Sequence, residues 1–282
     1  MHAAPDDMDS WPQQGGCQRP AAAAAVTLEG ANGSNAIAAC LGRGGERLEV
    51  LQWARANGFP WDEDTCAYAA FEGHLELELL QWAHANGCPW NEEVCANAAG
   101  GGRLEMLQWA RANGCPWDEG TLCTAASTGQ LHVLQWAHAN RCPGHEDICE
   151  FAALDGHLHV LQWARANGCP WDSSVCKAAA HGNQLELLQW ARANGCPWDS
   201  DTCSAAALSG HLELLQWARA YGCPWDAETC AAAARSNRFK ILKWARANGC
   251  PWDSDTCKFA TANYNVELLC WALVNGCPRH DA

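Results

Sequence analysis

The chain has few basic residues and no long apolar run. Its 282 residues include 18 Lys and Arg against 32 Asp and Glu, which gives a formal net charge of −14. A nucleic-acid backbone and an anionic lipid surface both bind clustered cations, so the composition argues against either as a partner. No stretch approaches the roughly 20 apolar residues of a membrane-spanning helix. We therefore expect neither nucleic-acid binding nor membrane association.

A basic secretory signal is also missing. The first ten residues, MHAAPDDMDS, are acidic, and the Ala-rich stretch at 20–26 is too short for the apolar core of a signal peptide. We expect a soluble cytoplasmic protein, with the nucleus as the alternative compartment. The 19 cysteines would stay mostly reduced there, and their odd number argues against a closed set of disulfides.

What the sequence has in abundance is a repeated phrase, LQWARANGCPWD, in a chain with 17 Trp and 25 Gly. The first Trp of the phrase recurs after one spacing of 29 residues and then, from Trp82 on, at spacings of 27. A duplicated Leu-Glu pair in HLELELLQW explains the longer spacing. Such regularity is typical of a tandem repeat array. The recurring residues are Trp53, Trp82, Trp109, Trp136, Trp163, Trp190, Trp217, Trp244 and Trp271.

Each copy predicts two short helices, as residues 199–225 illustrate. Asp199 suits an N-cap, and the following TCSAAALS places Cys and Ala on one face of a helix. Gly210 then breaks the chain, and HLELLQWARAYG predicts a second helix with an apolar stripe of Leu, Trp and Ala. Gly222 suits the left-handed end of that helix, and Pro224 prevents its continuation. Because one pair cannot bury enough surface to fold alone, we predict an all-α solenoid of stacked antiparallel helix pairs.

The unit resembles an ankyrin repeat. Residues 201–217, DTCSAAALSGHLELLQW, are similar to the family's TPLHxAAxxGHLEVVxxL pattern, and NGCPWD at 194–199 is similar to its AGADVN. The direct matches are Ala206, Ala207, Gly210, His211, Leu212 and Glu213. An ankyrin unit typically has 33 residues, and the six missing here fall between Asp199 and Asp201, where the family places a projecting β-hairpin finger.

The resemblance implies an ankyrin-like helical repeat solenoid, in a short Trp- and Cys-rich variant that lacks the finger. It also implies a scaffold that binds another protein and has no chemistry of its own. We expect residues 1–33 to form a flexible leader rich in Ala, Gly and Pro. Residues 34–282 would then form the array, with an N-terminal half-unit and about eight 27-residue repeats.

Two rows of cysteines run through the repeats and suggest an alternative function, as a metal-binding or thiol-redox protein. Structural zinc favours close ligand pairs, which no copy contains, and Phe59 and Leu122 stand at Cys positions where neither could be a ligand. Small, buried apolar residues explain the rows better, so we predict no metal and no cofactor. The row before Pro is Cys88, Cys115, Cys142, Cys169, Cys196, Cys223, Cys250 and Cys277. The row that opens the first helices is Cys66, Cys95, Cys149, Cys176, Cys203, Cys230 and Cys257.

Three other repeated residue types have plain structural interpretations. The Trp residues follow helical spacing and are expected in the core rather than as stacking platforms for nucleic acid. The His residues after Gly are expected to stabilise turns, because Arg and Gln replace them in other copies; they are His74, His157 and His211. An Arg row on the second helices is expected to be a solvated face with helix C-terminal charge; it comprises Arg55, Arg111, Arg165, Arg192, Arg219 and Arg246. No residue is a candidate for catalysis.

Positions that vary among the copies are free for recognition, whereas constant positions hold the stack together. Two such positions lie on the first helices, directly after the Cys and four residues further on. Both point away from the Cys and Ala face, on the helix that lines the concave side in ankyrin proteins. The predicted contact surface, named the inner strip, is Phe71, Glu150, Leu154, Lys177, His181, Leu208, Arg235 and Lys258.

The last predicted helix differs from the other second helices. Cys270 replaces a Gln, and Leu273 and Val274 replace an Arg and an Ala, so its outward face is more apolar. Terminal units of a solenoid need polar outer faces. We therefore predict an end contact there, through self-association or through a further unit.

Overall fold

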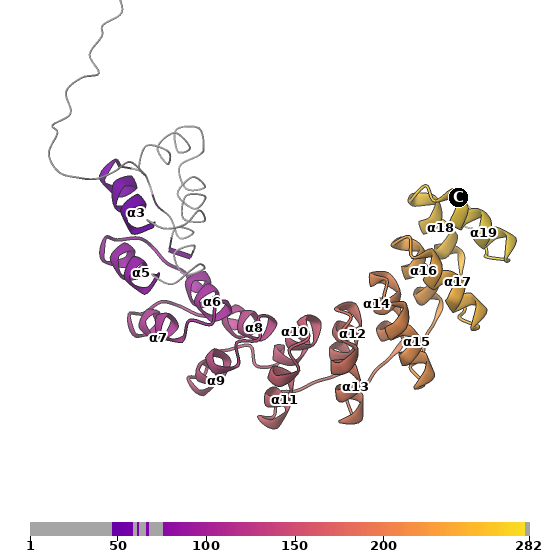
Figure 1. Cartoon of the computed structure of the whole chain (residues 1–282), viewed down its shortest axis with the longest axis horizontal. Helices are drawn as coiled ribbons and strands as arrows, with labels where there is room; N and C mark the ends of the chain where they lie inside the picture. The colour runs from indigo at the N-terminus through magenta and orange to yellow at the C-terminus, as the bar shows by residue number, and fades with distance from the viewer. Residues whose placement is uncertain (1–46, 59–60, 62–65, 68–75, 280–282) are drawn as a thin grey trace, which may run out of the picture.

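The computed structural model describes residues 47–58, 61, 66–67 and 76–279. Within these ranges the chain forms sixteen α-helices and no strand. Successive helices run back and forth and stack into a curved array (Figure 1), which confirms the predicted all-α solenoid of antiparallel helix pairs. The expected leader, 1–33, and the start of the half-unit lie outside the described residues, so the boundary at residue 34 stays a prediction.

The helices form two layers, named here by their place on the curve (Figure 1). The inner helices, which line the concave side, are α6 (Glu92–Gly100), α8 (Glu119–Ser127), α10 (Ile148–Asp155), α12 (Ser173–His181), α14 (Ser200–Ser209), α16 (Ala227–Arg235) and α18 (Ser254–Ala262). The outer helices are α3 (Arg47–Ala56), α5 (Glu76–Ala85), α7 (Leu104–Ala112), α9 (Leu131–Ala139), α11 (Leu158–Ala166), α13 (Leu185–Ala193), α15 (Leu212–Ala220), α17 (Phe239–Ala247) and α19 (Val266–Val274).

Helix ends follow the predicted signals. Asp199 is the N-cap of α14, and its side chain accepts a hydrogen bond from the backbone N–H of Asp201 at 3.1 Å. Gly222 follows α15 with φ of 84°, a left-handed conformation that Gly adopts without a steric penalty. The next residue, Cys223, donates its backbone N–H to the carbonyl of Ala218 at 2.9 Å. The Pro-Trp return between units therefore begins from a closed helix end.

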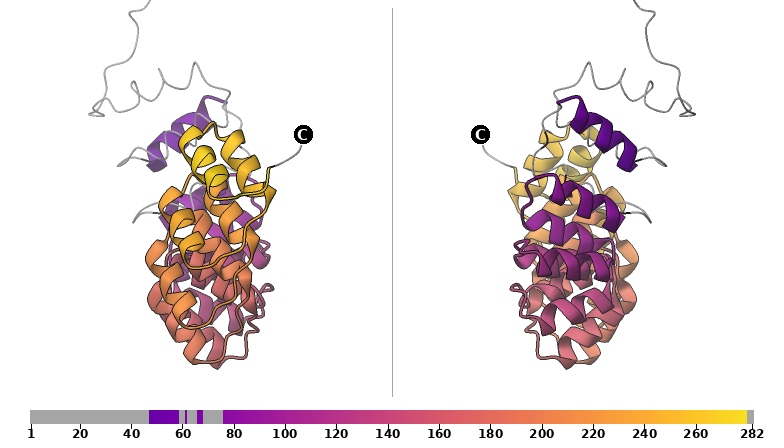
Figure 2. Two further views of the ribbon diagram at one scale, coloured as in Figure 1. Left: turned by 90° about the vertical axis from the view of Figure 1, so that its right-hand side faces the viewer. Right: turned by 90° about the vertical axis from the view of Figure 1, so that its left-hand side faces the viewer.

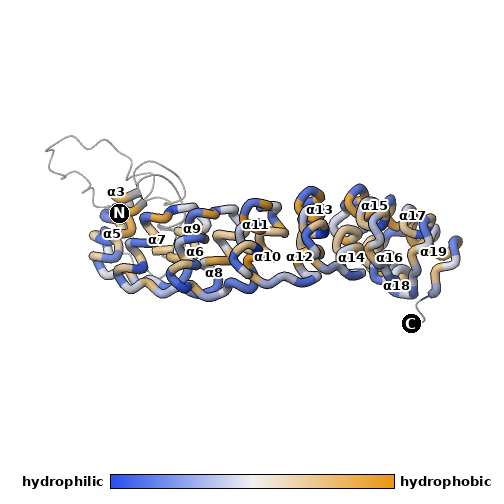
Figure 3. The backbone as a smooth tube through the Cα atoms, turned by 90° about the horizontal axis from the view of Figure 1, so that it is seen from below, coloured by the Kyte–Doolittle hydropathy of each residue, from blue (hydrophilic) through white to orange (hydrophobic). Residues whose placement is uncertain are grey.

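Small side chains fill the inner layer and larger ones the outer layer. On α14, Cys203, Ala206 and Ala207 are completely buried, and on α15 the pair Leu214 and Leu215 is buried with Ala218. Hydrophobic and hydrophilic residues are interleaved within the units along the array (Figure 3). The predicted apolar faces are thus confirmed in both helices of the unit.

The difference in side-chain size explains the curvature. Neighbouring inner helices approach each other closely through their Ala faces, whereas neighbouring outer helices are separated by partly buried Trp side chains. A stack that is narrower on one side than on the other must bend toward the narrow side. Both views in Figure 2 show the two ends of the array displaced to the same side of its middle.

Turn side chains connect each unit to the one before it. His157 donates from Nε2 to the carbonyl of Ser127 at 2.8 Å, and His211 does the same to the carbonyl of His181 at 3.1 Å. Gln184, at the equivalent position, donates to the carbonyl of Leu154 at 3.4 Å. The predicted turn-stabilising role is confirmed for the two His residues, and His74 lies outside the described residues.

Candidate protein-binding surface

The structure places seven of the eight inner-strip residues on the concave layer. Glu150 and Leu154 lie on α10, and the others follow on successive inner helices along the curve (Figure 1). Leu154 and Leu208 are half-buried, while the charged members are exposed. Phe71 lies outside the described residues. The residues placed are Glu150, Leu154, Lys177, His181, Leu208, Arg235 and Lys258.

The cationic members of the strip, Lys177, Arg235 and Lys258, have acidic partners within the array. Lys177 bridges to Asp201 of the next unit at 2.8 Å, and this hydrogen bond raises the pKa of Lys177 above its usual range. Arg235 pairs with Glu228 of the same helix at 2.8 Å. These pairs are about half exposed, and exposed pairs contribute about 0–1 kcal/mol each. A charged partner can therefore compete for these side chains at low cost.

His181 is held by a neighbouring turn. Its Nδ1 is hydrogen-bonded to Oγ of Ser209 at 2.8 Å, and its backbone carbonyl accepts the bond from His211. The ring lies at the edge of the concave face, where α12 ends. The position of the His181 ring in the inner strip therefore depends on the turn between α14 and α15.

Two aromatic residues on the concave layer were missed by the sequence prediction. Phe151 on α10 is 38% exposed, beside Glu150. Phe259 on α18 is half-buried, with the Arg235 guanidinium 4.5 Å from its ring centre and the Lys258 ammonium at 5.9 Å. Both stand two residues after the Cys, a position that also varies among the copies. Comparing that position would have found them, because most copies hold a smaller side chain there.

The two cysteine rows meet inside each regular unit. Cys223 donates its S–H to the backbone carbonyl of Asp199 at 3.4 Å, and its thiol also lies against that of Cys203. The hydrogen bond between the two thiols, together with burial, raises the pKa of Cys203 far above its usual range. The sequence prediction considered only close pairs of cysteines and so missed this contact, which joins residues 20 apart.

Cysteine burial extends through the described array. Every described Cys is buried except the half-exposed Cys123 and the exposed Cys270. Burial raises the pKa of Cys149 to about 12 and that of Cys123 to about 11. A thiol is nucleophilic only as its thiolate, so these residues are poorly reactive. Within the described ranges, no group of three or more His, Cys, Asp or Glu side chains could hold a metal ion.

The Arg row is built into the solenoid and is not simply a solvated face. Arg219 lies with its guanidinium carbon 4.1 Å from the ring centre of Trp225 and donates to the carbonyl of Cys223. The Trp225 ring meets Trp244 of the next unit edge-on, at 5.8 Å between centres. The expectation of a purely solvated row was therefore wrong, because the guanidinium donates to the backbone of the return and stacks on the return Trp.

The Trp residues are less buried than a core position requires. They pack against the buried cluster but remain half-exposed along the outer edge. Their indoles form edge-to-face pairs between consecutive units, at 5.7–6.0 Å between centres in the regular returns. The prediction of core Trp residues is corrected in this respect, since Arg and His side chains cover faces that the core does not.

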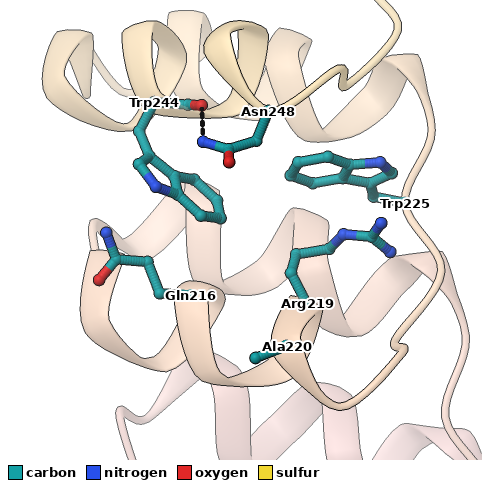
Figure 4. A pocket seen from close by; sticks show the side chains of 6 residues that line it. All are labelled: Gln216, Arg219, Ala220, Trp225, Trp244 and Asn248. Carbon is teal, nitrogen blue, oxygen red and sulfur yellow. Dashed lines mark hydrogen bonds between the residues drawn. The ribbon is translucent and has the colours of Figure 1, made fainter.

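A groove of about 300 Å³ lies between the outer helices α15 and α17. Figure 4 shows Gln216 and Arg219 on one wall and Trp244 and Asn248 on the other, with Trp225 lying over the Arg219 guanidinium. Asn248 donates to the backbone carbonyl of Trp244 at 2.8 Å and so fixes that wall. The groove is on the outer layer, away from the inner strip.

The last outer helix presents an apolar surface, as the sequence predicted for Cys270 and Val274, whereas Leu273 is half-buried against the neighbouring cluster. Val266 is 68% exposed and Val274 is 85% exposed, and Cys270 lies between them on α19. Tyr264, in the turn before the helix, is 91% exposed. In the part of the chain that the structure describes, no helix has the length and apolar character needed to span a bilayer.

Comparisons with known proteins add little to this description. No family model matches the sequence, and no curated protein matches it. Among 166 matching chains of solved structures is the crystal structure of the human ASB11 ankyrin repeat domain. The two chains are 16% identical, with a TM-score of 0.45, over 56% of this chain and 84% of that one. The description of the fold therefore rests on the helix array itself.

Proposed function

We propose that this protein is a non-catalytic scaffold that binds a partner protein along the inner strip. One observation carries the proposal: the concave layer repeats its buried Cys and Ala residues from unit to unit while its exposed positions change. Buried repetition keeps the stack regular, and exposed variation gives each unit a different contact. The sequence resemblance to a short, finger-less ankyrin array supports the same function, in the cytoplasm or nucleus.

The surface offers both apolar and charged side chains for contact. Phe151, Leu154 and Phe259 offer partly exposed apolar area, and aromatic residues are common anchors in such interfaces. Lys177 and Arg235 supply exposed charges whose present pairs are weak. Phe71 belongs to the proposed strip on its sequence position alone.

The first experiment compares an inner-strip variant with a matched outer-face control. The variant carries Glu150→Ala, Leu154→Ala and Lys177→Ala, together with His181→Ala. The control carries Gln162→Ala and Gln189→Ala, which change exposed residues of α11 and α13. A protein captured from cell lysate by the intact array is purified, and its Kd for each variant is measured. We expect at least tenfold weaker binding to the inner-strip variant only; equal loss in both variants would contradict the surface.

The alternative function, metal binding or thiol redox through the Cys rows, is not favoured by the structure. The described cysteines of the two rows are buried, and the hydrogen bond from Cys223 together with burial raises the pKa of Cys203. The test is alkylation by iodoacetamide at pH 8, read by mass spectrometry, in a chain with Cys17→Ser and Cys40→Ser. We expect Cys270 to react in the folded protein and Cys203 to react only after unfolding. Rapid labelling of the buried row in folded protein would revive the alternative.

We extend the proposal to self-association through the exposed face of α19. Val266 and Val274 are the exposed apolar residues that a second copy would cover. Sedimentation at increasing protein concentration should show a dimer that Val266→Glu with Val274→Glu abolishes. A monomer at all concentrations, with α19 unprotected in hydrogen exchange, would remove self-association from the proposal.

A further inference from the structure

One outer helix reverses the charge pattern of all the others. On α17, Lys240 stands where the remaining outer helices hold Glu or His, and Lys243 stands where they hold Gln or Cys. The residues at the first position are Glu49, Glu78, Glu105, His132, His159, Glu186, Glu213 and Glu267. Those at the second are Gln52, Gln81, Gln108, Gln135, Gln162, Gln189, Gln216 and Cys270. This helix thus carries added positive charge in a chain whose net charge is −14.

The added cations are exposed and have no acidic partner. Lys240 and Lys243 are both exposed, and Lys243 holds its ammonium 3.8 Å from the centre of the Phe239 ring. Arg238, at the start of the helix, packs beside the turn at Gly210. A Cβ atom added to Gly210 would lie 2.8 Å from Nε of Arg238. Among the described residues, none of these three cations forms an ion pair. The three residues, named the basic patch, therefore present unneutralised charge.

The basic patch lies on the helix that forms one wall of the α15–α17 groove. Trp244 directly follows Lys243 in the sequence, and its indole lines that groove with Asn248 (Figure 4). The opposite wall contributes Gln216 and the Arg219 guanidinium, which is stacked on Trp225. Cationic and aromatic groups are thus placed next to a concave surface on the outer layer.

We propose that the basic patch and the α15–α17 groove bind a short acidic segment of a partner protein. Carboxylates of the segment lie against Lys240, Lys243 and Arg238, and one apolar side chain of the segment enters the groove beside Trp244. The charge of the patch supplies complementarity, and the indole supplies apolar contact. This surface is separate from the inner strip, so it extends the scaffold to a second contact.

The size of the patch favours a short peptide over a longer polyanion. Helices in contact lie about 8–10 Å apart, and the helices on either side of α17 carry acids at the equivalent position, Glu213 and Glu267. A nucleic acid presents a charge about every 1.7 Å of duplex and needs a longer basic track. An anionic membrane also needs a broader basic face. A short acidic segment fits between the two flanking acids.

The test is a fluorescence-anisotropy titration with a fluorescein-labelled pentapeptide of Glu residues that contains one central Leu and spans about 17 Å when extended. The matched variant carries Lys240→Glu and Lys243→Gln, which restores the residues found in neighbouring units and is therefore compatible with the fold. We expect this variant to bind the peptide at least tenfold more weakly than the intact chain, and added salt to weaken the intact chain's binding. Equal binding by both proteins would overturn the proposal.

A second variant adds two lysines at the equivalent positions of another outer helix. Glu186→Lys with Gln189→Lys places two lysines on α13, next to the equivalent Trp190, in an otherwise unchanged chain. We expect calorimetry to show a second peptide bound per chain. A stoichiometry that stays at one would show that two lysines beside the Trp of another outer helix are not sufficient and would overturn the proposed mode.

Two further titrations identify the class of partner. A single-stranded oligonucleotide and vesicles with anionic lipid are titrated in parallel, and we expect both to bind more weakly than the peptide. Tighter binding of either one, lost on Lys240→Glu and Lys243→Gln, would overturn the peptide in favour of that polyanion. The inner-strip variant should bind the pentapeptide normally, so failure here is distinguishable from failure of the scaffold function.

Discussion

The return at residues 142–148 differs from the regular return at 196–202. The comparison distinguishes the contacts that stack the units from the contacts that stabilise the edge of the array. The regular sequence CPWDSDT supplies Trp198, which stacks under Arg192 at 4.1 Å, and the N-cap Asp199. The irregular sequence CPGHEDI has Gly144 and His145 at those two positions. Both the stacking ring and the capping carboxylate are therefore absent from one return in the middle of the array.

The local consequences are visible in the helix that follows. The inner helix α10 begins at Ile148, whereas α12 begins at Ser173, which corresponds to Glu146 after one 27-residue step. Its cap residue, Asp147, makes no side-chain hydrogen bond to the helix. The inner helix has thus lost its first two residues together with its cap.

The stacking of the units is nevertheless preserved through this return. Ile148, Cys149 and Ala152 are buried as in other units, and the Trp163 ring keeps an edge-on neighbour in His138, at 5.4 Å. The inner Cys and Ala faces therefore carry the stacking, and the Pro-Trp-Asp return adds stability at the edge without deciding the register.

The largest predicted effect comes from grafting the irregular return onto a regular unit. Trp198→Gly with Asp199→His should lower the free energy of unfolding by about 3–4 kcal/mol, from lost indole burial and a lost N-cap. The measurement is urea unfolding followed by circular dichroism. The double variant should keep its helical content in the absence of urea, because the inner faces are unchanged. A loss below about 1 kcal/mol would mean that the return contributes little.

Much of this architecture could be predicted from the sequence, because repetition reveals which positions are constant. The N-cap at Asp199, the left-handed Gly222 and the buried Ala206 all follow from local rules that apply within one unit. Contacts between units could not be found in this way. The pairing of Cys203 with Cys223 and the stacking of Arg219 on Trp225 depend on how the chain folds back, which spacing alone does not specify.

The candidate surface was harder to predict than the fold. Varying positions indicated exposed residues such as Glu150 and Lys177, but the side-chain pair that Lys177 makes with Asp201 depends on the distance between units. Phe151 was missed because only two of the varying positions were compared. Lys240 and Lys243 were missed because the outer layer was treated as a solvated face, so its one reversal of charge was not singled out.

The next effect tests how tightly the irregular return is packed. Gly144→Ala should cost about 2–3 kcal/mol, because φ is 92° and the new Cβ would lie 2.7 Å from Cα of Glu119. Gly168→Ala is the matched control, since its φ of 80° is similar and nothing lies within 4 Å of the new Cβ. The control should cost about 1 kcal/mol by urea unfolding. Equal costs would show that Glu119 moves away from the new Cβ without a penalty and that the return is loosely packed.

A smaller effect asks whether the two edges of the array act independently. His157→Ala removes the turn hydrogen bond beside the irregular return, and His211→Ala removes the same bond beside a regular one. Each should cost about 1 kcal/mol in the free energy of unfolding. If the turn hydrogen bond contributes independently of the return, the missing Trp has no effect on its contribution. The two costs should then agree within about 0.5 kcal/mol. A clearly larger cost for His157→Ala would show that the turn hydrogen bond contributes more to stability in the unit whose return lacks its Trp.

The smallest effect isolates the stacking of Arg on the return Trp. Arg219→Lys keeps the positive charge but loses the planar group that stacks on Trp225 and donates to the carbonyl of Cys223, so it should cost about 0.5–1 kcal/mol. His138→Lys is the comparison, because its return has Gly144 in place of the stacking Trp, so the change loses only the edge-on contact of His138 with Trp163. That change should stay within about 0.5 kcal/mol of the wild type in the same urea titration. If both substitutions cost the same, stacking on the indole adds nothing to stability; a cost confined to Arg219→Lys assigns the stabilisation to the Trp225 stack and the bond to the Cys223 carbonyl.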